Sequence, residues 1–186
     1  MQYGRGFGLI ELCIGLAIVG ILLLWGLPTV QYYMEQTRAE VRIMQLYHTL
    51  NFSRQVALSR HQRVIICPTQ DQHHCQGDWI NQLMVFADEN NDHQRAETEP
   101  LLRLLVPNTR GNLTWQGFGA TQYIAFLPYG WHNQQNGTFL YCSPSRTVPM
   151  AKGLIISKSG RIRLATVVDN HQIVDGSGHI LTCTGS

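Results

Sequence analysis

Two arginines separated by one residue lie near the C-terminal end of the chain, in the sequence Gly160-Arg161-Ile162-Arg163. On a β-strand, residues two apart project from the same face, so the two guanidinium groups would stand about 7 Å apart. This spacing suits contact with successive phosphates of a nucleic-acid backbone. Gly160 would let a turn bring its backbone close to a ligand. Other cations that the fold could add to this basic patch are Lys158, Lys152 and Arg146.

The distribution of charge supports a basic face, although the formal net charge is only +2. Five acids lie between residues 88 and 99, and none lies between residues 100 and 168. The second range contains seven cations, namely Arg103, Arg110, Arg146, Lys152, Lys158, Arg161 and Arg163. Such an asymmetry indicates an anionic partner for one face. The alternative is a solvated basic surface without a partner, which is the commonest situation of arginine side chains.

Four of the five cysteines lie in the polar part of the chain, and Cys13 lies in an apolar segment. In an exported protein, which meets oxidising conditions, an even set of cysteines indicates two disulfides. Four cysteines allow three pairings. Sequence proximity favours Cys67–Cys75, which leaves Cys142–Cys183 to hold the C-terminal tail.

Two patterns offer metal ligands. Cys67, His73, His74 and Cys75 supply the atoms of a zinc site, but adjacent ligands rarely reach one tetrahedral ion together. The residues from Asp88 to Glu99 have the acid spacing of a calcium-binding loop, but His93 occupies the position that needs a sharp turn. We therefore expect an acidic hairpin turn, and no metal or cofactor.

The sequence lacks the parts of an enzyme. It has no glycine-rich phosphate loop, no serine in a nucleophile-elbow pattern and no paired carboxylates in an apolar setting. We expect a protein that works by binding and assembly.

The N-terminal segment is apolar and contains one informative charge. Residues 1–6 are polar, and residues 7–27 form an apolar stretch that can cross a bilayer as a helix. A cut between Gly6 and Phe7 would precede this stretch, so the helix would be kept. Glu11 would then be the fifth residue, able to pair with the new terminal ammonium of a neighbouring subunit. A carboxylate in hydrocarbon usually has such a partner.

Residues 28–60 show a helical period. Apolar or small residues recur every three or four positions, and we expect this stripe to pack on a sheet. Its members are Val30, Met34, Thr37, Val41, Met44, Tyr47, Leu50 and Ala57. The charged residues expected on the other faces are Glu35, Arg38, Glu40 and Arg42.

Residues 61–186 change to short β-rich segments separated by turn residues, which predicts an antiparallel sheet head. The expected strands are 63–68, 82–88, 101–106, 123–128, 138–143, 153–157 and 161–167. Asn136-Gly137 predicts a tight turn, and Lys158-Ser159-Gly160 predicts a hairpin between the last two strands. One long helix followed by such a head is an α+β protein.

The N-terminal pattern resembles that of the type IV pilin and pseudopilin family. The matching residues are Gly6, Phe7, Leu9, Ile10, Glu11 and Leu12. In that family a prepilin peptidase cuts after the glycine and methylates the new terminus, and the glutamate guides subunits into a filament. The resemblance implies a single-pass bacterial inner-membrane protein with a periplasmic head. It also implies other pilin subunits as partners, and exposure at the cell surface in a pilus.

The head resembles the FimT/GspH branch of minor pilins. The motifs are Cys67-Pro68, Asp78-Trp79, Leu83 to Asp88, Phe126, Pro128, Gly130, Asn136 to Phe139, Cys142 and Ser157 to Arg163. In FimT-like minor pilins of transformable bacteria, a G-R-x-R motif near the C-terminus is implicated in binding incoming DNA. The resemblance implies a minor pilin that binds double-stranded DNA without sequence preference and acts in natural transformation. The alternative is a structural minor pilin or a type II secretion pseudopilin that binds no DNA.

One loop departs from the family pattern. Tyr129 and Trp131 flank Gly130, where family members more often carry a basic residue. The two rings could stack on bases. Packing within the core or the loop is the expectation that we favour.

Overall fold

The computed structural model describes residues 8–106, 110–117, 122–131, 136–144, 151–168 and 172–183. The chain forms two compact units, residues 1–37 and residues 38–186.

The first unit contains the N-terminal part of helix α1, which runs from Leu9 to Arg60. Within the described residues, α1 is the one helix long and apolar enough to cross a membrane by length and composition. Apolar side chains are exposed along it, as they are on a helix that faces lipid. They include Leu9, Ile10, Leu12, Ile14, Leu16 and Leu22. Pro28 lies inside the helix and does not end it.

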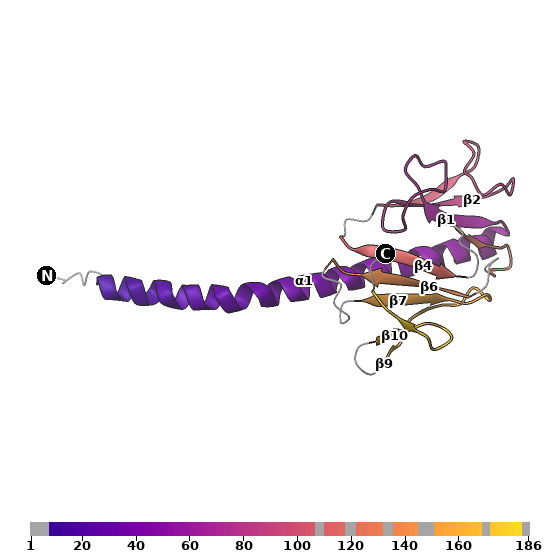
Figure 1. Cartoon of the computed structure of the whole chain (residues 1–186). Helices are drawn as coiled ribbons and strands as arrows, with labels where there is room; N and C mark the ends of the chain where they lie inside the picture. Colours follow the sequence, from indigo (N-terminus) through magenta and orange to yellow (C-terminus); the bar gives the residue numbers. More distant parts are fainter. Residues whose placement is uncertain are drawn as a thin grey trace. The chain divides into compact units, whose positions relative to one another are not determined.

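In its described residues, the second unit forms two four-stranded antiparallel sheets and one three-stranded sheet (Figure 1). The sheet of order β3-β2-β1-β5 consists of β1 (Val64–Pro68), β2 (Leu83–Ala87), β3 (Leu101–Leu105) and β5 (Ile124–Phe126). The sheet of order β4-β6-β7-β8 consists of β4 (Asn112–Gly117), β6 (Gly137–Cys142), β7 (Lys152–Ile156) and β8 (Ile162–Leu164). The small sheet of order β11-β10-β9 consists of β9 (Val167–Val168), β10 (Gln172–Val174) and β11 (Ile180–Leu181).

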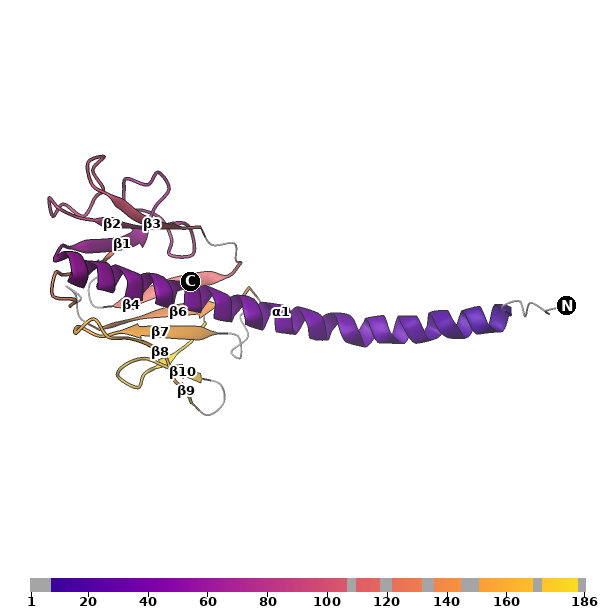
Figure 2. The same cartoon turned by 180° about the vertical axis from the view of Figure 1, so that it is seen from behind.

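The part of α1 from Arg38 onward packs on both four-stranded sheets. It lies behind the strands in Figure 1 and in front of them in Figure 2. One apolar cluster joins the helix to both sheets, and its members include Leu46, Leu50, Val64, Val85, Phe139 and Leu154. A fully buried leucine of this kind contributes about 2 kcal/mol of hydrophobic stabilisation. The predicted α+β fold, a long helix on an antiparallel head, is confirmed.

The predicted face of the helix is right only in part, because Tyr47, Leu50 and Ala57 of the expected stripe pack in the core. Val41 and Met44 of the expected stripe are exposed, whereas Arg42, which was expected on an outer face, is completely buried. The buried face contains Ala39, Arg42, Ile43, Leu46, Thr49, Leu50, Ser53 and Ala57. Arg42, Thr49 and Ser53 each donate a hydrogen bond to a carbonyl oxygen within the fold, so hydrophobicity alone does not identify the whole buried face.

Arg42 shows how a charge is accommodated in this core. Its Nη2 donates a hydrogen bond to the carbonyl oxygen of Trp79 over 2.8 Å. Burial lowers the pKa of the Arg42 guanidinium to about 10, so the side chain remains charged at neutral pH. Thr49 and Ser53 instead donate to helix carbonyl oxygens four residues earlier.

The strands follow the sequence pattern with local differences. Six of the predicted strands overlap β1, β2, β3, β5, β6 and β7, and both β6 and β7 begin one residue before the predicted start. The expected strand 161–167 is divided, because β8 ends at Leu164 and β9 joins the small sheet. The pattern does not predict β4, β10 or β11. Gly137 is the first residue of β6, and a side chain there would clash with the Trp115 ring.

The small sheet covers one face of the β4-β6-β7-β8 sheet, namely the face that points away from the helix. Ile173 of β10 packs with Leu140 and Ala151 in a separate apolar cluster. The disulfide Cys142–Cys183 joins β6 to the segment after β11. The other disulfide is Cys67–Cys75. Both pairings are those favoured by sequence proximity.

Candidate nucleic-acid interface

Residues 157–163, here called the basic hairpin, join β7 to β8 as predicted. The Ser157 N–H donates to the Arg161 carbonyl over 3.0 Å, and the Gly160 N–H donates to the Ser157 carbonyl over 2.8 Å. Gly160 has a φ of 74°, a conformation that glycine adopts without steric cost. The Lys158 N–H donates to Oδ1 of Asn136, which fixes the turn from outside. The hairpin is therefore a defined turn.

Arg161 and Arg163 project away from the helix. Ile162, between them, belongs to the core that α1 covers. Arg163 pairs with Ile155 in the ladder, and neighbouring strand residues alternate between the two faces. The side chains of Lys158, Arg161 and Arg163 are exposed and make no hydrogen bond or ion pair within the described part of the chain. The three cations of the basic hairpin are thus available to an external anion.

The structure gives Gly160 a role different from the expected one. Gly160 is buried, and a Cβ placed on it would clash with the carbonyl oxygen of Gly130 and lie 2.9 Å from Nε of Arg54. The same Nε donates to the Gly130 carbonyl over 3.0 Å. The backbone of Gly160 is therefore closed by protein, and it does not approach a ligand. Because Gly160 has no side chain, the hairpin can pack against the loop that contains Gly130.

Lys152 does not widen the patch. It lies on β7 two and four residues from Leu154 and Ile156, which face the helix, so it shares their face. Its Nζ forms an ion pair with Oε1 of Glu40 over 3.2 Å. Lys152 thus lies on the opposite face from Arg163. Arg146 lies outside the described residues.

Residues 127–131, here called the aromatic loop, lie against the basic hairpin through the Gly130–Gly160 contact. Tyr129 is 60% exposed and Trp131 is 52% exposed. Their rings contact each other edge to face, with centroids 5.8 Å apart. Of the two packings expected, the rings show packing within the loop and not within the core. The glycine between two aromatic residues, next to Pro128, is the sequence signal for a surface turn.

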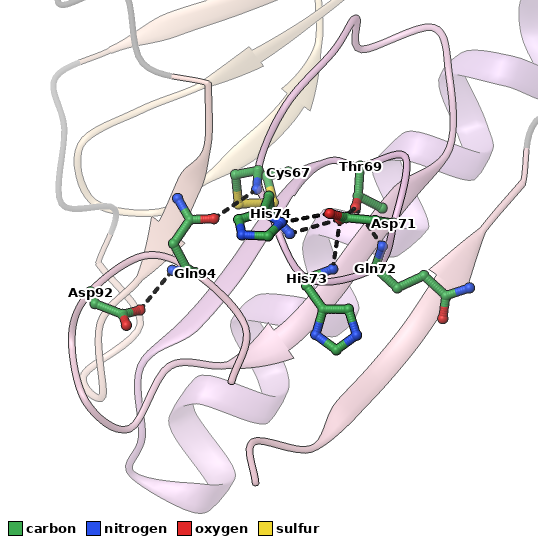
Figure 3. Close-up of a disulfide and its surroundings, with 9 residues drawn as sticks. Cys67, Thr69, Asp71, Gln72, His73, His74, Asp92 and Gln94 are labelled. Atoms are coloured by element: carbon green, nitrogen blue, oxygen red, sulfur yellow. Dashed lines mark hydrogen bonds and ion pairs between the residues drawn. A yellow bond between two sulfur atoms is a disulfide. The ribbon is translucent and has the colours of Figure 1, made fainter. Parts of the chain in front are cut away.

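Cys67 and Cys75 form a disulfide with each other, so their sulfur atoms are not available as zinc ligands. This excludes the alternative of a zinc site. Cys67 and Cys75 close residues 68–74 into a loop, which Figure 3 shows with its neighbours. Asp71 organises this loop, because its Oδ1 accepts from the backbone N–H groups of His73 and His74. These hydrogen bonds, with that from the His74 ring, hold the pKa of the Asp71 carboxyl well below its usual range. No cluster of three or more metal-ligating side chains occurs in the described residues.

Residues 88–99, here called the acidic loop, direct their carboxylates at their own backbone. The buried Glu99 accepts from the N–H groups of Glu89 and Ala96 over 2.8 and 2.9 Å, and from that of Asn90 over 3.3 Å. Oδ1 of Asp88 accepts from the Asn91 N–H over 2.8 Å. Burial raises the pKa of the Asp88 carboxyl. The acids with calcium-loop spacing therefore stabilise a turn through hydrogen bonds to its backbone.

The processing residues lie at the start of the first unit. Gly6 and Phe7 lie outside the described residues. Glu11 occupies the first turn of α1, and its Oε2 accepts from the Gly8 N–H over 2.9 Å. This contact satisfies one of the free donors at the helix N-terminus.

Comparisons with known proteins give a family and a fold. The profile of the GspH family of type II transport proteins matches residues 42–160. The type IV minor pilin FimU of Pseudomonas aeruginosa is similar in structure, with a TM-score of 0.51 and 22% identity over 75% of this chain and 93% of that chain. The minor pseudopilin EpsH of the Vibrio cholerae type 2 secretion system has a TM-score of 0.49 and 13% identity over 68% of this chain and 95% of that chain. No curated protein sequence matches significantly.

The matched range covers most of the chain and ends at Gly160, so it leaves Arg161 and Arg163 outside. The matched family is described as type II transport proteins, and the fold is similar to that of a type IV minor pilin. The apolar N-terminal helix fits a membrane-anchored pilus component. The chain belongs to the GspH family of type II transport proteins, and its fold is similar to that of a type IV minor pilin.

Proposed function

We propose that this minor pilin binds DNA without sequence preference through the basic hairpin and acts in DNA uptake. The observation that carries the proposal is the exposure of Lys158, Arg161 and Arg163, none of which has a partner in the described residues. No acid occurs between residues 100 and 168 to repel a phosphate backbone. Phosphate contacts carry no base information, so the binding is indifferent to sequence.

The proposal includes the chain's setting in the cell. A prepilin peptidase removes residues 1–6, residues 7–27 anchor the protein in the inner membrane, and residues 28–60 lead into the head formed by residues 61–186. Glu11 then pairs with the terminal ammonium of a neighbouring subunit, which offsets the cost of a carboxylate in hydrocarbon. Assembly into a pilus carries the head from the periplasm to the cell surface.

A gel-shift experiment with the full chain in detergent tests DNA binding. Wild-type protein should retard a 30-base-pair duplex of arbitrary sequence, and added salt should weaken the complex. Arg161→Ala/Arg163→Ala should lower the affinity at least about tenfold. The matched control is Arg38→Ala/Arg60→Ala, which removes the same charge from exposed positions of α1. An equal loss of DNA affinity in both double variants, or no loss in Arg161→Ala/Arg163→Ala, would overturn the assignment of DNA binding to the hairpin.

The second candidate is a structural role in priming or assembling a filament, either a pilus or a type II secretion pseudopilus, without DNA binding. It is favoured by the family match, because the GspH family is one of type II transport proteins. Deletion should then abolish filament assembly or secretion. Complementation with Arg161→Ala/Arg163→Ala separates the two roles. It should restore assembly in either case, and it should fail to restore DNA uptake only if the hairpin binds DNA.

A further inference from the structure

We infer that the aromatic loop is a stacking platform for unpaired bases, so that the interface prefers single-stranded DNA, or frayed duplex ends, to intact duplex. This inference rests on the proposed function of the basic hairpin. It adds a second contact chemistry beside the phosphate-binding cations, and it names the form of nucleic acid that the two together fit.

The first support is the exposure of two large rings at one place. Tyr129 and Trp131 keep more than half of their accessible surface in solvent, although both are residues that proteins normally bury in large part. Their edge-to-face contact leaves ring faces outside the pair. A free ring face beside bound phosphates is the feature that single-strand binding proteins use to hold bases.

The second support is the fixed position of these rings beside the cations. The Leu127 N–H donates to the Trp131 carbonyl over 2.8 Å, and the Gly130 N–H donates to the Leu127 carbonyl over 2.7 Å. The carbonyl oxygen of Gly130 contacts Gly160, the residue directly before Arg161. The aromatic loop is thus closed on itself and held on the hairpin. A preordered platform loses little conformational entropy when a ligand binds.

The third support is the form of the ligand. In an intact duplex the base faces are stacked on each other, and only their edges are accessible in the grooves. Exposed rings therefore gain nothing from a duplex beyond incidental contact. In a single strand the faces are free, and one base stacks on an aromatic ring while phosphates contact Arg161 and Arg163. The combination fits a single strand better than either feature alone.

The surrounding charges are compatible with this ligand. Arg54 lies beneath the contact between the two loops, with its Nε on the Gly130 carbonyl. The loop after β10, which covers Ile155, contains Asp175. Oδ1 of Asp175 accepts from the N–H groups of Ser177 and His179, so this carboxylate is held by its own turn.

The experiment measures binding of the full chain in detergent to two fluorescent probes, a 30-nucleotide oligothymidylate and a 30-base-pair duplex, at equal salt. Wild-type protein should bind the single strand more tightly. Tyr129→Ala/Trp131→Ala should weaken single-strand binding about tenfold and change duplex binding less than twofold. Tyr129→Phe/Trp131→Phe should keep wild-type affinity for both probes, because the stacking surface remains.

The matched control is Tyr32→Ala/Tyr33→Ala. These two tyrosines are also exposed and in edge-to-face contact, with centroids 5.8 Å apart, but they lie on α1. Their loss should leave both affinities unchanged. Oligothymidylate should also quench the emission of Trp131, and Trp131→Phe should abolish that part of the quenching.

The outcomes separate this inference from the proposed function. Equal loss of single-strand and duplex binding in Tyr129→Ala/Trp131→Ala would show a structural effect and overturn the stacking platform. Unchanged single-strand binding would overturn it as well, and would leave these rings free for a neighbouring pilin subunit. In both cases duplex binding that depends on Arg161 and Arg163 would still support the proposed function. If wild-type protein binds neither probe, both proposals fail.

Discussion

The basic hairpin and the acidic loop carry opposite charges, and they differ in what those charges contact. In the acidic loop, Glu99 and Asp88 accept hydrogen bonds from the backbone of their own turn. In the basic hairpin, the side chains of Lys158, Arg161 and Arg163 have no partner within the part of the chain that the structure describes. The backbone N–H groups of Ser157, Lys158 and Gly160 in the hairpin, in contrast, donate hydrogen bonds within the fold.

The difference indicates which charge stabilises the fold and which is available for binding. A buried carboxylate that accepts several N–H groups cannot be removed without leaving donors unsatisfied. A solvated guanidinium contributes little to folding, and it can exchange water and counterions for a phosphate. Mutations in the acidic loop should therefore change stability, and mutations in the basic hairpin should change binding.

The largest expected effect is that of Glu99→Ala. Three backbone N–H groups, those of Glu89, Asn90 and Ala96, lose their acceptor, and the first and third bonds are short. The free energy of unfolding should fall by about 3 kcal/mol. Urea unfolding of the full chain in detergent, followed by near-ultraviolet circular dichroism, measures the change. Glu97→Ala, at an exposed position, should change stability by less than about 0.5 kcal/mol. Similar losses in the two variants would contradict the role of Glu99.

The salt dependence of DNA affinity should follow the number of free cations on the hairpin. Three phosphate contacts give a slope of about −2.7 for the logarithm of affinity against the logarithm of salt concentration. Affinity should then fall about 40-fold between 50 and 200 mM salt. In Arg161→Ala/Arg163→Ala the slope should be about −0.9, which is a fall of about 3.5-fold. Fluorescence anisotropy titrations at four salt concentrations measure both slopes. An unchanged slope in the double variant would show that Arg161 and Arg163 do not contact DNA phosphates.

Asp88→Asn should have a smaller effect that depends on pH. Burial raises the pKa of the Asp88 carboxyl, and the Asn91 N–H and the Arg63 guanidinium, 4.0 Å away, offset this only in part. A raised pKa in the folded state gives stability that is present below the unfolded value, about 3.9, and lost as pH rises through the folded value. Asparagine keeps an acceptor for the Asn91 N–H without the charge.

Asp88→Asn should therefore raise the melting temperature at pH 7 and leave it unchanged at pH 3. Thermal unfolding at the two pH values measures this difference. A lower melting temperature of the variant at pH 7 would contradict this prediction. It would show that the ion pair with Arg63 stabilises the charged carboxylate by more than burial destabilises it.

The sequence pattern predicts the elements well and the packing faces poorly. The β-branched segments that contain β1 and β2 are continuous apolar runs, and both strands are fully buried. The lysine–serine–glycine turn is predicted because only glycine readily adopts the φ of Gly160. The Cys67–Cys75 disulfide follows from sequence proximity. Each of these features is encoded by local chemistry.

The features that depend on tertiary contacts are not predicted. Arg42 looks like a surface charge until Trp79, 37 residues away, supplies a carbonyl acceptor. Gly160 looks like a ligand-contacting glycine until Gly130 is placed against it. No local pattern encodes either contact, because both join segments that are distant in sequence.

The smallest expected effect is that of Lys152→Ala, and it tests whether position or net charge governs binding. Lys152 and Arg163 both lie in the second four-stranded sheet, but Lys152 faces the helix and pairs with Glu40. An exposed ion pair of this kind contributes less than about 1 kcal/mol to stability. Lys152→Ala should change DNA affinity less than twofold, whereas Arg163→Ala, which removes the same charge, should weaken binding several-fold. Anisotropy titrations of the two single variants at one salt concentration make the comparison. If the two variants lose affinity equally, DNA responds to the total charge of the head, and the exposed hairpin has no special place in binding.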